Sequence, residues 1–284
     1  MKVTLWGTRG SLACAGPETI GYGGDTSTVE VETGDGALVL DAGTGVRSLG
    51  DALLGARRVD LLLTHLHMDH IQGLGFFRPL LDPDTEVHLW GPASGTLSLA
   101  QRLARYLSPP LFPLRVRELE SVVFHDVGPG SFSIGSLTVS ADLLSHPGLT
   151  LGYRIEAGAA VLAYLPDHEP ALGNPRFPGA AEWTSGSRLA QGASLLIHDA
   201  QYTSQEYEER MGWGHSAFEH VLAFAELSGV EALVPFHHDP WHSDQMLDEL
   251  MAASRSRALG FELIPGKVRT TIELEESRGR EVHP

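Results

Sequence analysis

The chain has 284 residues, 42% of them hydrophobic and 20% charged, a composition that supplies a core and excludes global disorder. The 20 Lys and Arg residues against 36 Asp and Glu residues give a net charge of −16, which argues against a nucleic-acid binder. The single cysteine, Cys14, excludes an internal disulfide. No signal peptide and no run near the ~20 apolar residues of a membrane helix is visible. We therefore expect a cytoplasmic protein with no membrane segment, forming one domain over residues 1–284.

Short apolar and β-branched runs between glycine-rich turns predict strands in the first half of the chain. The first three runs are expected to form a meander with turn-length connections, whereas helices at about Val46–Leu54 and Leu97–Leu107 separate the later ones. The predicted strands are Val3–Trp6, Thr28–Glu32, Ala37–Asp41, Val59–Thr64 and Glu86–Trp90.

A second series of apolar runs resembles the first in kind. Two mixed sheets with helices on their outer faces, an αββα sandwich, accommodate both series without a long loop that lacks secondary structure. Proline-rich segments at Ser108–Pro113 and Glu169–Ala180 cannot be regular helices and are expected to form rims or lids. The charged tail Glu275–Pro284 is expected to be frayed. The second series comprises Leu137–Leu144, Leu149–Glu156, Ala160–Leu165, Ser194–His198, Glu231–Phe236 and Val268–Leu274.

The clearest chemical signal is an H-x-H-x-D-H motif that directly follows the strand Val59–Thr64. Four such polar groups within six residues would each need a hydrogen-bond partner in a core, and a metal ion supplies those partners at once. His65 and His67 alternate along an extended loop and can face one ion, whereas Asp69 and His70 can face a second. The alternative is a solvated polar loop.

This motif resembles the signature of the metallo-β-lactamase fold superfamily, and the strand ending in Asp41-Ala42-Gly43 resembles that family's strand before the metal loop, where Asp41 would brace the loop. The resemblance implies three further ligands from distant segments. The last of them is His237 or His238, and we favour His237, with His238 or His242 lining the pocket. The implied first site is His65, His67, His146 and Asp167, and the second is Asp69, His70, His237 and the shared Asp167.

Two divalent ions in such a site would lower the pKa of a shared water toward ~7 and provide a bridging hydroxide for hydrolysis. Imidazole and carboxylate ligands suit zinc, and manganese or iron would also bind them. The sequence therefore predicts a dinuclear metal-dependent hydrolase and leaves the identity of the metal open.

A strand ending in His198-Asp199 and a later Gly214-His215-Ser216 resemble the phosphodiesterase branch of the superfamily, which includes tRNA 3′-end processing endonucleases and small cyclic-phosphate phosphodiesterases. Ser216 and Glu219 have the spacing of a capping box, which predicts His215 at a helix amino terminus, where anions bind. The resemblance implies that His215 protonates the leaving alkoxide, that Asp199 orients it, and that Asp69 assists catalysis. Otherwise Asp199 and Ser216 merely cap turns.

A small or cyclic phosphodiester is the favoured substrate, because the net charge of −16 is unfavourable for tRNA and no basic arm is visible. One alternative is a thioesterase or lactonase of the same fold, and another is a non-catalytic metal-dependent sensor or binding module. A homodimer through exposed Phe76-Phe77 or Leu111-Phe112 is a further expectation. The physiological substrate stays open.

Overall fold

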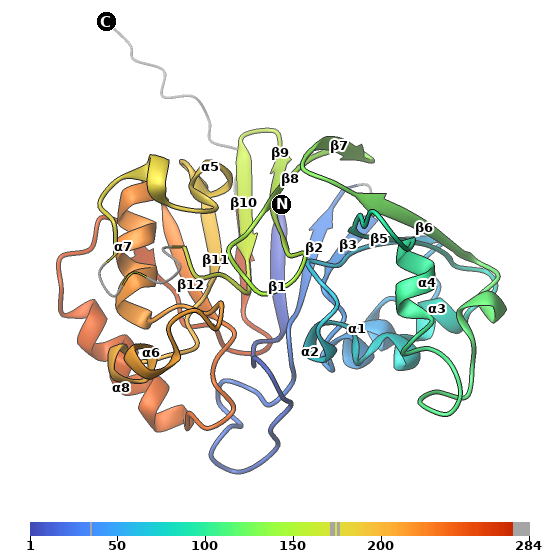
Figure 1. Ribbon diagram of the computed structural model, residues 1–284, viewed down its shortest axis with the longest axis horizontal. Coiled ribbons are helices and arrows are strands. Elements are labelled where there is room, and N and C mark those ends of the chain that lie inside the picture. Colours follow the sequence, from blue (N-terminus) through green and yellow to red (C-terminus); the bar gives the residue numbers. More distant parts are fainter. Residues whose placement is uncertain (35, 171–173, 175–176, 275–284) are drawn as a thin grey trace, which may run out of the picture.

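The computed structural model describes residues 1–34, 36–170, 174 and 177–274. Two mixed sheets face one another, and helices cover their outer faces (Figure 1). This arrangement confirms the predicted αββα sandwich. The expectation about Glu275–Pro284 lies outside the described residues, as does part of the segment Glu169–Ala180.

The first sheet has the strand order β14-β1-β2-β3-β4-β5-β6. Its strands β14, β1, β2 and β3 are antiparallel, whereas β3, β4, β5 and β6 run parallel. The predicted meander is therefore correct, but residues 8–27 connect β1 to β2, so this connection is far longer than the expected turn. The strands are β1 (Lys2–Gly7), β2 (Thr28–Thr33), β3 (Gly36–Leu40), β4 (Arg58–Leu62), β5 (Glu86–Pro92), β6 (Val122–Val127) and β14 (Thr271–Glu273).

The second sheet has the order β13-β12-β11-β10-β9-β8-β7. It repeats the plan of the first, because β7 to β10 are antiparallel and β10 to β13 are parallel. The sequence analysis did not predict β6 and β7, in which only the last residue of each strand is buried and the apolar pattern is therefore weak. The strands are β7 (Gly130–Ile134), β8 (Leu137–Leu143), β9 (Leu151–Ala157), β10 (Ala160–Leu165), β11 (Leu195–Asp199), β12 (Ala232–Phe236) and β13 (Glu262–Leu263).

Helices connect the parallel strands of both sheets and cover their outer faces (Figure 1). On the first sheet they are α1 (Val46–Ala52), α2 (Met68–Ile71), η1 (Leu74–Phe76), α3 (Arg78–Leu81), α4 (Leu99–Leu103) and η2 (Val116–Glu118). On the second they are η3 (Ala181–Trp183), α5 (Ser187–Ala190), α6 (Ser204–Arg210), α7 (Phe218–Ser228) and α8 (Asp244–Arg255).

Three apolar layers hold the sandwich together. The central layer joins the inner faces of the sheets and includes Val31, Tyr153 and Phe236, which are all fully buried. An outer layer packs each sheet against its helices. Phe77 belongs to one of these outer layers with 0% exposure, so its predicted role as an exposed dimer contact is wrong, whereas its neighbour Phe76 is 62% exposed.

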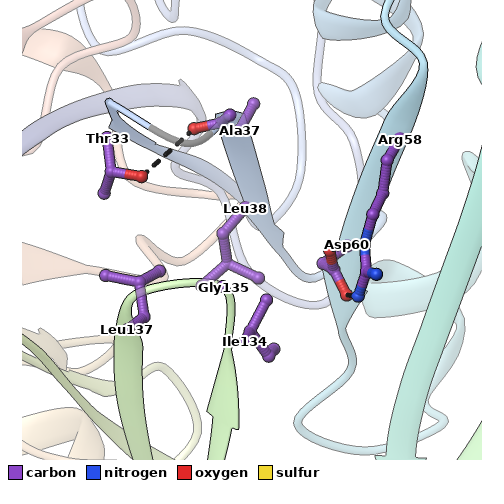
Figure 2. A pocket seen from close by; sticks show the side chains of 9 residues that line it. Thr33, Ala37, Leu38, Arg58, Asp60, Ile134, Gly135 and Leu137 are labelled. Atoms are coloured by element: carbon purple, nitrogen blue, oxygen red, sulfur yellow. Dashed lines mark hydrogen bonds and ion pairs between the residues drawn. The ribbon is translucent and has the colours of Figure 1, made fainter.

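A small hollow of about 150 Å³ lies between the sheets, at the amino-terminal ends of β3 and β4 and the turn between β7 and β8 (Figure 2). The ion pair between Arg58 and Asp60, with Nε 2.8 Å from Oδ2, forms part of its wall. Four of the candidate ligands follow the opposite, carboxyl end of β4. This hollow is therefore separate from the site described next.

Candidate metal centre

The candidate ligands all follow the carboxyl ends of strands. The loop after β4 and the short helix α2 carry four of them, and His146, Asp167 and His237 follow β8, β10 and β12 of the second sheet. The sheets face each other, and so these segments, far apart in sequence, meet at one edge of the sandwich, where parallel strands commonly place their sites.

The first group contains His65, His67, His146 and Asp167, whose ligand atoms all lie within 4.8 Å of one another. Nδ1 of His67 is 3.2 Å from Nε2 of His146. Oδ2 of Asp167 is 3.6 Å from Nε2 of His146 and 3.7 Å from Nε2 of His65. The structure thus brings together the four residues expected at the first site.

The second group contains Asp69, His70, Asp167 and His237, again within 4.8 Å. Oδ1 of Asp167 is 2.9 Å from Nε2 of His70 and 3.3 Å from Nε2 of His237. Nε2 of His237 is also 3.1 Å from Oδ2 of Asp69. Asp167 therefore faces the first group with one carboxylate oxygen and the second group with the other.

The neighbouring histidines lie elsewhere. His238 is buried, with Nε2 3.1 Å from the carbonyl oxygen of Gly266, and its ring contacts Tyr22. His242 is 2% exposed and pairs with Glu206 at 3.0 Å, so the expectation that His238 or His242 lines the pocket is wrong. His237 takes a positive φ of 59° directly after β12, which turns its ring into the second group.

The donor set fits divalent cations. Nε2 of His65 is buried and has no hydrogen-bond partner among the described residues, although it faces Asp167. Nitrogen atoms bound ~2.1 Å from one tetrahedral ion lie ~3.4 Å apart, close to the 3.4 Å between Nε2 of His70 and Nε2 of His237. Imidazole and carboxylate groups crowded in this way need a positive charge between them.

The pKa values also indicate that the ligand cluster needs a positive charge. Burial lowers the pKa of His65 well below its ordinary value. Burial also opposes a charge on His70, but Asp167, Asp41 and Asp69 outweigh it and raise the pKa of His70 well above its ordinary value. Burial alone would raise the pKa of Asp69, whereas the nearby imidazoles of His70 and His237 lower it. The carboxylates thus favour a proton on His70, and a bound metal ion would replace that proton, because neutral imidazoles and ionised carboxylates are the forms that bind metals.

Asp41 braces the metal loop, as the resemblance implies. It is fully buried, and its carboxylate accepts hydrogen bonds from Nδ1 of His70 at 2.8 Å and from the backbone N–H of Thr64 at 2.8 Å. The hydroxyl of Tyr164 on β10 donates to the same carboxylate at 2.9 Å. Asp41 therefore fixes the start of the loop and directs Nε2 of His70 toward the second group.

Two further acceptors orient imidazoles, and the sequence did not indicate either. Nδ1 of His237 donates to Oε1 of Gln201 at 2.9 Å, and Nδ1 of His146 donates to the carbonyl oxygen of Gly214 at 2.8 Å. Asp69 accepts 2.7 Å from the backbone N–H of Ser11. Bonds of this kind fix the tautomer and leave the other ring nitrogen to face a metal. They depend on tertiary contacts, for which the sequence carries no local signal.

His215 and Asp199 form a pair beside both groups. Nδ1 of His215 donates to Oδ2 of Asp199 at 2.7 Å, and the His215 ring lies 5.0 Å from the rings of both His146 and His237. Burial lowers the pKa of His215, but the charge of Asp199 and the hydrogen bond to it prevail and raise this pKa to about 9. The Asp199 carboxylate thus favours the protonated form of the imidazole that lies against the centre.

The predicted capping box is wrong. Helix α7 begins after Ala217, without a side-chain cap, and the hydroxyl of Ser216 donates instead to the carbonyl oxygen of His168 at 2.6 Å. The backbone N–H of Ser216 donates to Asp199 at 3.1 Å. Hydrogen bonds across the fold therefore prevail over the local capping pattern, and His215 precedes the helix in a loop.

That loop is anchored by Glu169, a buried carboxylate that sequence reasoning missed. Glu169 accepts hydrogen bonds from the backbone N–H of Gly212 at 2.9 Å and of Gly214 at 2.8 Å. The hydroxyl of Tyr207 on α6 donates to the same group at 2.7 Å. Three donors on one buried carboxylate make the segment before His215 rigid.

Comparisons with known proteins agree with this geometry. The sequence-family model described as the beta-lactamase superfamily domain matches residues 37–238 of this chain. Ribonuclease Z of Lactococcus lactis subsp. lactis (strain IL1403) is 25% identical over 240 residues, covering 69% of this chain and 76% of that protein. Ribonuclease Z of Mycobacterium sp. (strain KMS) is 26% identical over 273 residues, covering 84% of this chain and 85% of that protein.

Solved structures share the fold. The metallo-beta-lactamase fold protein YhfI from Bacillus subtilis superposes with a TM-score of 0.69 at 18% identity, covering 95% of this chain and 98% of that one. The short form of human tRNase Z superposes with a TM-score of 0.68 at 20% identity, covering 97% of this chain and 100% of that one.

The chain belongs to the beta-lactamase superfamily. It is a metal-dependent hydrolase of this fold, related to ribonuclease Z, and its His and Asp cluster suits divalent metal ions. In the described part of the chain, every helix is too short or too polar to cross a membrane.

Proposed function

We propose that the protein is a phosphodiesterase that hydrolyses a small or cyclic phosphodiester. The observation that carries this proposal is the pair of His215 and Asp199, whose imidazole packs against a ring from each candidate metal group. Cleavage of a phosphodiester with an alkoxide leaving group needs a proton at the departing oxygen. Acyl transfer to water with a thiolate leaving group has no such need.

Two divalent ions would be held by His65, His67, His146 and Asp167 and by Asp69, His70, His237 and Asp167. They would lower the pKa of a water and neutralise charge on the phosphate oxygens. We propose zinc, because imidazoles make up three of the four candidate ligands in the first group and two of the four in the second. Manganese and iron are alternatives that metal analysis distinguishes.

The roles of the remaining residues follow from their contacts. Asp199 occupies Nδ1 of His215 and so leaves Nε2–H of the same ring to donate a proton to the leaving oxygen. Asp69 contacts His237 and Ser11 and helps to hold the centre in place. A net charge of −16 favours a small diester over a long polyanion such as tRNA.

The test measures which type of bond the metal-loaded enzyme hydrolyses. We expect turnover of bis(p-nitrophenyl) phosphate and of a nucleoside 2′,3′-cyclic phosphate, and little turnover of thioesters or lactones. Turnover of the acyl substrates alone would replace the proposal with a thioesterase or lactonase. Two bound ions without hydrolysis of any diester would indicate a sensor or binding module.

A variant separates the proton donor from the metal site. His215→Ala should slow cleavage of the cyclic phosphate by about 10²–10⁴-fold, because its alkoxide leaving group needs the proton. The effect on bis(p-nitrophenyl) phosphate should be smaller, since p-nitrophenolate leaves without protonation. Metal content should not change. His125→Ala, on β6 beside Trp90 and outside the site, is the matched control.

A further inference from the structure

A cavity of about 630 Å³ opens beside the metal loop, between α2 and the segment that continues α4. We call it the α2–α4 cavity. Two of its residues, Leu66 and Met68, flank the candidate ligand His67 in sequence, so that one wall is the metal loop itself. The opposite wall contains Arg102, Arg105, Tyr106 and Leu111.

The walls of this cavity are mainly apolar and held in place. The hydroxyl of Tyr106 donates to the carbonyl oxygen of Gln72 at 2.6 Å, which fixes its ring against the chain after α2. Met68 is 50% exposed and Leu111 is 69% exposed, so apolar surface is open to a ligand. Cavities of ~300–1,000 Å³ with mostly apolar walls and a few polar groups are typical of small-molecule sites.

The two arginines differ in what they bind. Arg102 donates to the carbonyl oxygen of Pro92 and pairs with Asp126 at 3.4 Å. Arg105 is exposed, and its guanidinium makes no hydrogen bond or ion pair with any described residue. Arg78 pairs with Asp51 at the surface, whereas the exposed Arg47, Arg57 and Arg117 have no such partner among the described residues but lie outside this cavity. A free guanidinium beside an apolar cavity is suited to bind an anion such as a phosphate.

We propose that the α2–α4 cavity is a substrate subsite. It takes an apolar or planar group of the diester, and Arg105 binds a further phosphate that the same substrate carries. The proposal rests on the proposed function, because the metal loop that forms one wall would hold the scissile phosphate. The substrate class is therefore a phosphodiester with a second phosphate, of the kind represented by a 5′-phosphorylated nucleoside 2′,3′-cyclic phosphate.

The test compares two matched substrates, adenosine 2′,3′-cyclic phosphate with and without a 5′-phosphate. We expect the wild-type enzyme to have about a tenfold higher kcat/KM for the 5′-phosphorylated substrate, mainly through KM, since one charged contact gives a gain of this size. Arg105→Gln should abolish that preference by lowering kcat/KM for the 5′-phosphorylated substrate about tenfold, to the value of the unphosphorylated one. Arg117→Gln removes the same charge from η2, outside the cavity, and should leave the preference intact.

Several outcomes would overturn the inference. If bis(p-nitrophenyl) phosphate is hydrolysed but the two adenosine substrates are used equally, the subsite is wrong and the proposed function stands. If no diester is hydrolysed, both fail. A second copy of the chain is the rival occupant of the cavity. Sedimentation should show the same mass for the wild type and Leu111→Asp, and a dimer that this variant dissociates would replace the subsite with an interface.

Discussion

Asp41 is the residue on which the order of the metal loop depends most directly. It adopts a positive φ of 56°, a conformation that Asn also tolerates well, so Asp41→Asn should preserve the backbone while it removes the charge. His70 would lose its ionic acceptor. We expect metal affinity to fall by about 10–100-fold, measured by competition with a chelator.

The control for this change is Asp60→Asn. Asp60 is also a buried carboxylate, on the strand β4 that leads into the metal loop, but it contacts Arg58 and Trp90 and no candidate ligand. The Asp60→Asn protein should therefore be somewhat less stable than the wild type, and its metal affinity should not change. Equal metal affinity in Asp41→Asn and the wild type would contradict the role given to Asp41.

Glu169 acts on the proton donor through the loop that precedes it. Glu169→Ala leaves three donors, including the N–H groups of Gly212 and Gly214, without their acceptor. Cleavage of a cyclic phosphate should slow by about 10–100-fold as His215 is displaced, whereas bis(p-nitrophenyl) phosphate should be affected less. Steady-state kinetics on the two substrates gives the comparison.

A double-variant cycle distinguishes this positioning role from a general loss of stability. Once His215 is replaced by alanine, a further change of Glu169 should have little additional effect on the cyclic phosphate, because the displaced group is already absent. The rate losses of the two single variants could instead add fully in the double variant, or Glu169→Ala could slow both substrates equally. Either result would mean that Glu169 supports only the fold.

At the scale of the element, the loop from Gly212 to Gly214 approaches the metal centre so closely at Gly214 that a side chain cannot fit there. A Cβ on Gly214 would lie 2.3 Å from Cδ of Pro147 and 2.5 Å from Nδ1 of His146, and φ is 90°. Gly214→Ala should therefore displace His146 and lower both metal content and activity. Metal analysis and kinetics of the purified variant measure the two effects.

Gly212 offers a matched control within the same loop. Its φ is 85°, but a Cβ there would meet nothing within 4 Å. Gly212→Ala should therefore cost about 1–3 kcal/mol of stability from backbone strain, while metal content stays at the wild-type level. If both alanine variants keep their metal, the close approach at Gly214 does not matter to the site.

At the scale of the whole molecule, the candidate centre joins the two sheets. The loop after β4 in the first sheet supplies His65, His67, Asp69 and His70, and the second supplies His146, Asp167 and His237. Removing the metal should therefore lower Tm. A ligand at 100 times its Kd contributes about 2.7 kcal/mol. Calorimetry before and after chelation measures the change.

Restoring the metal is the control for that experiment, because a chelator can act on a protein in other ways. Addition of zinc should return Tm to its starting value, and a variant such as His65→Ala should respond less to both treatments. A Tm that does not depend on metal in the wild-type protein would mean that the two groups of ligands are stable without a cation.

The sequence by itself determined the class of fold and the candidate ligands of the metal loop. Apolar alternation identifies strands because each sheet face buries one set of side chains. The motif from His65 to His70 is local, so its chemistry is visible without any knowledge of the fold. The apolar runs predicted the αββα sandwich, and the resemblance of the motif to the metallo-β-lactamase signature pointed to the superfamily that the family model later showed.

Tertiary structure alone decided the contacts between segments. The turn at His237 directs this ring, and not that of His238, into the centre. Gln201 and Glu169 show no motif, since their partners are brought to them by strand order, and the capping pattern at Ser216 fails because His168 accepts its hydroxyl. Hydrogen bonds between distant residues depend on how the sheets pack, and local periodicity does not encode that packing.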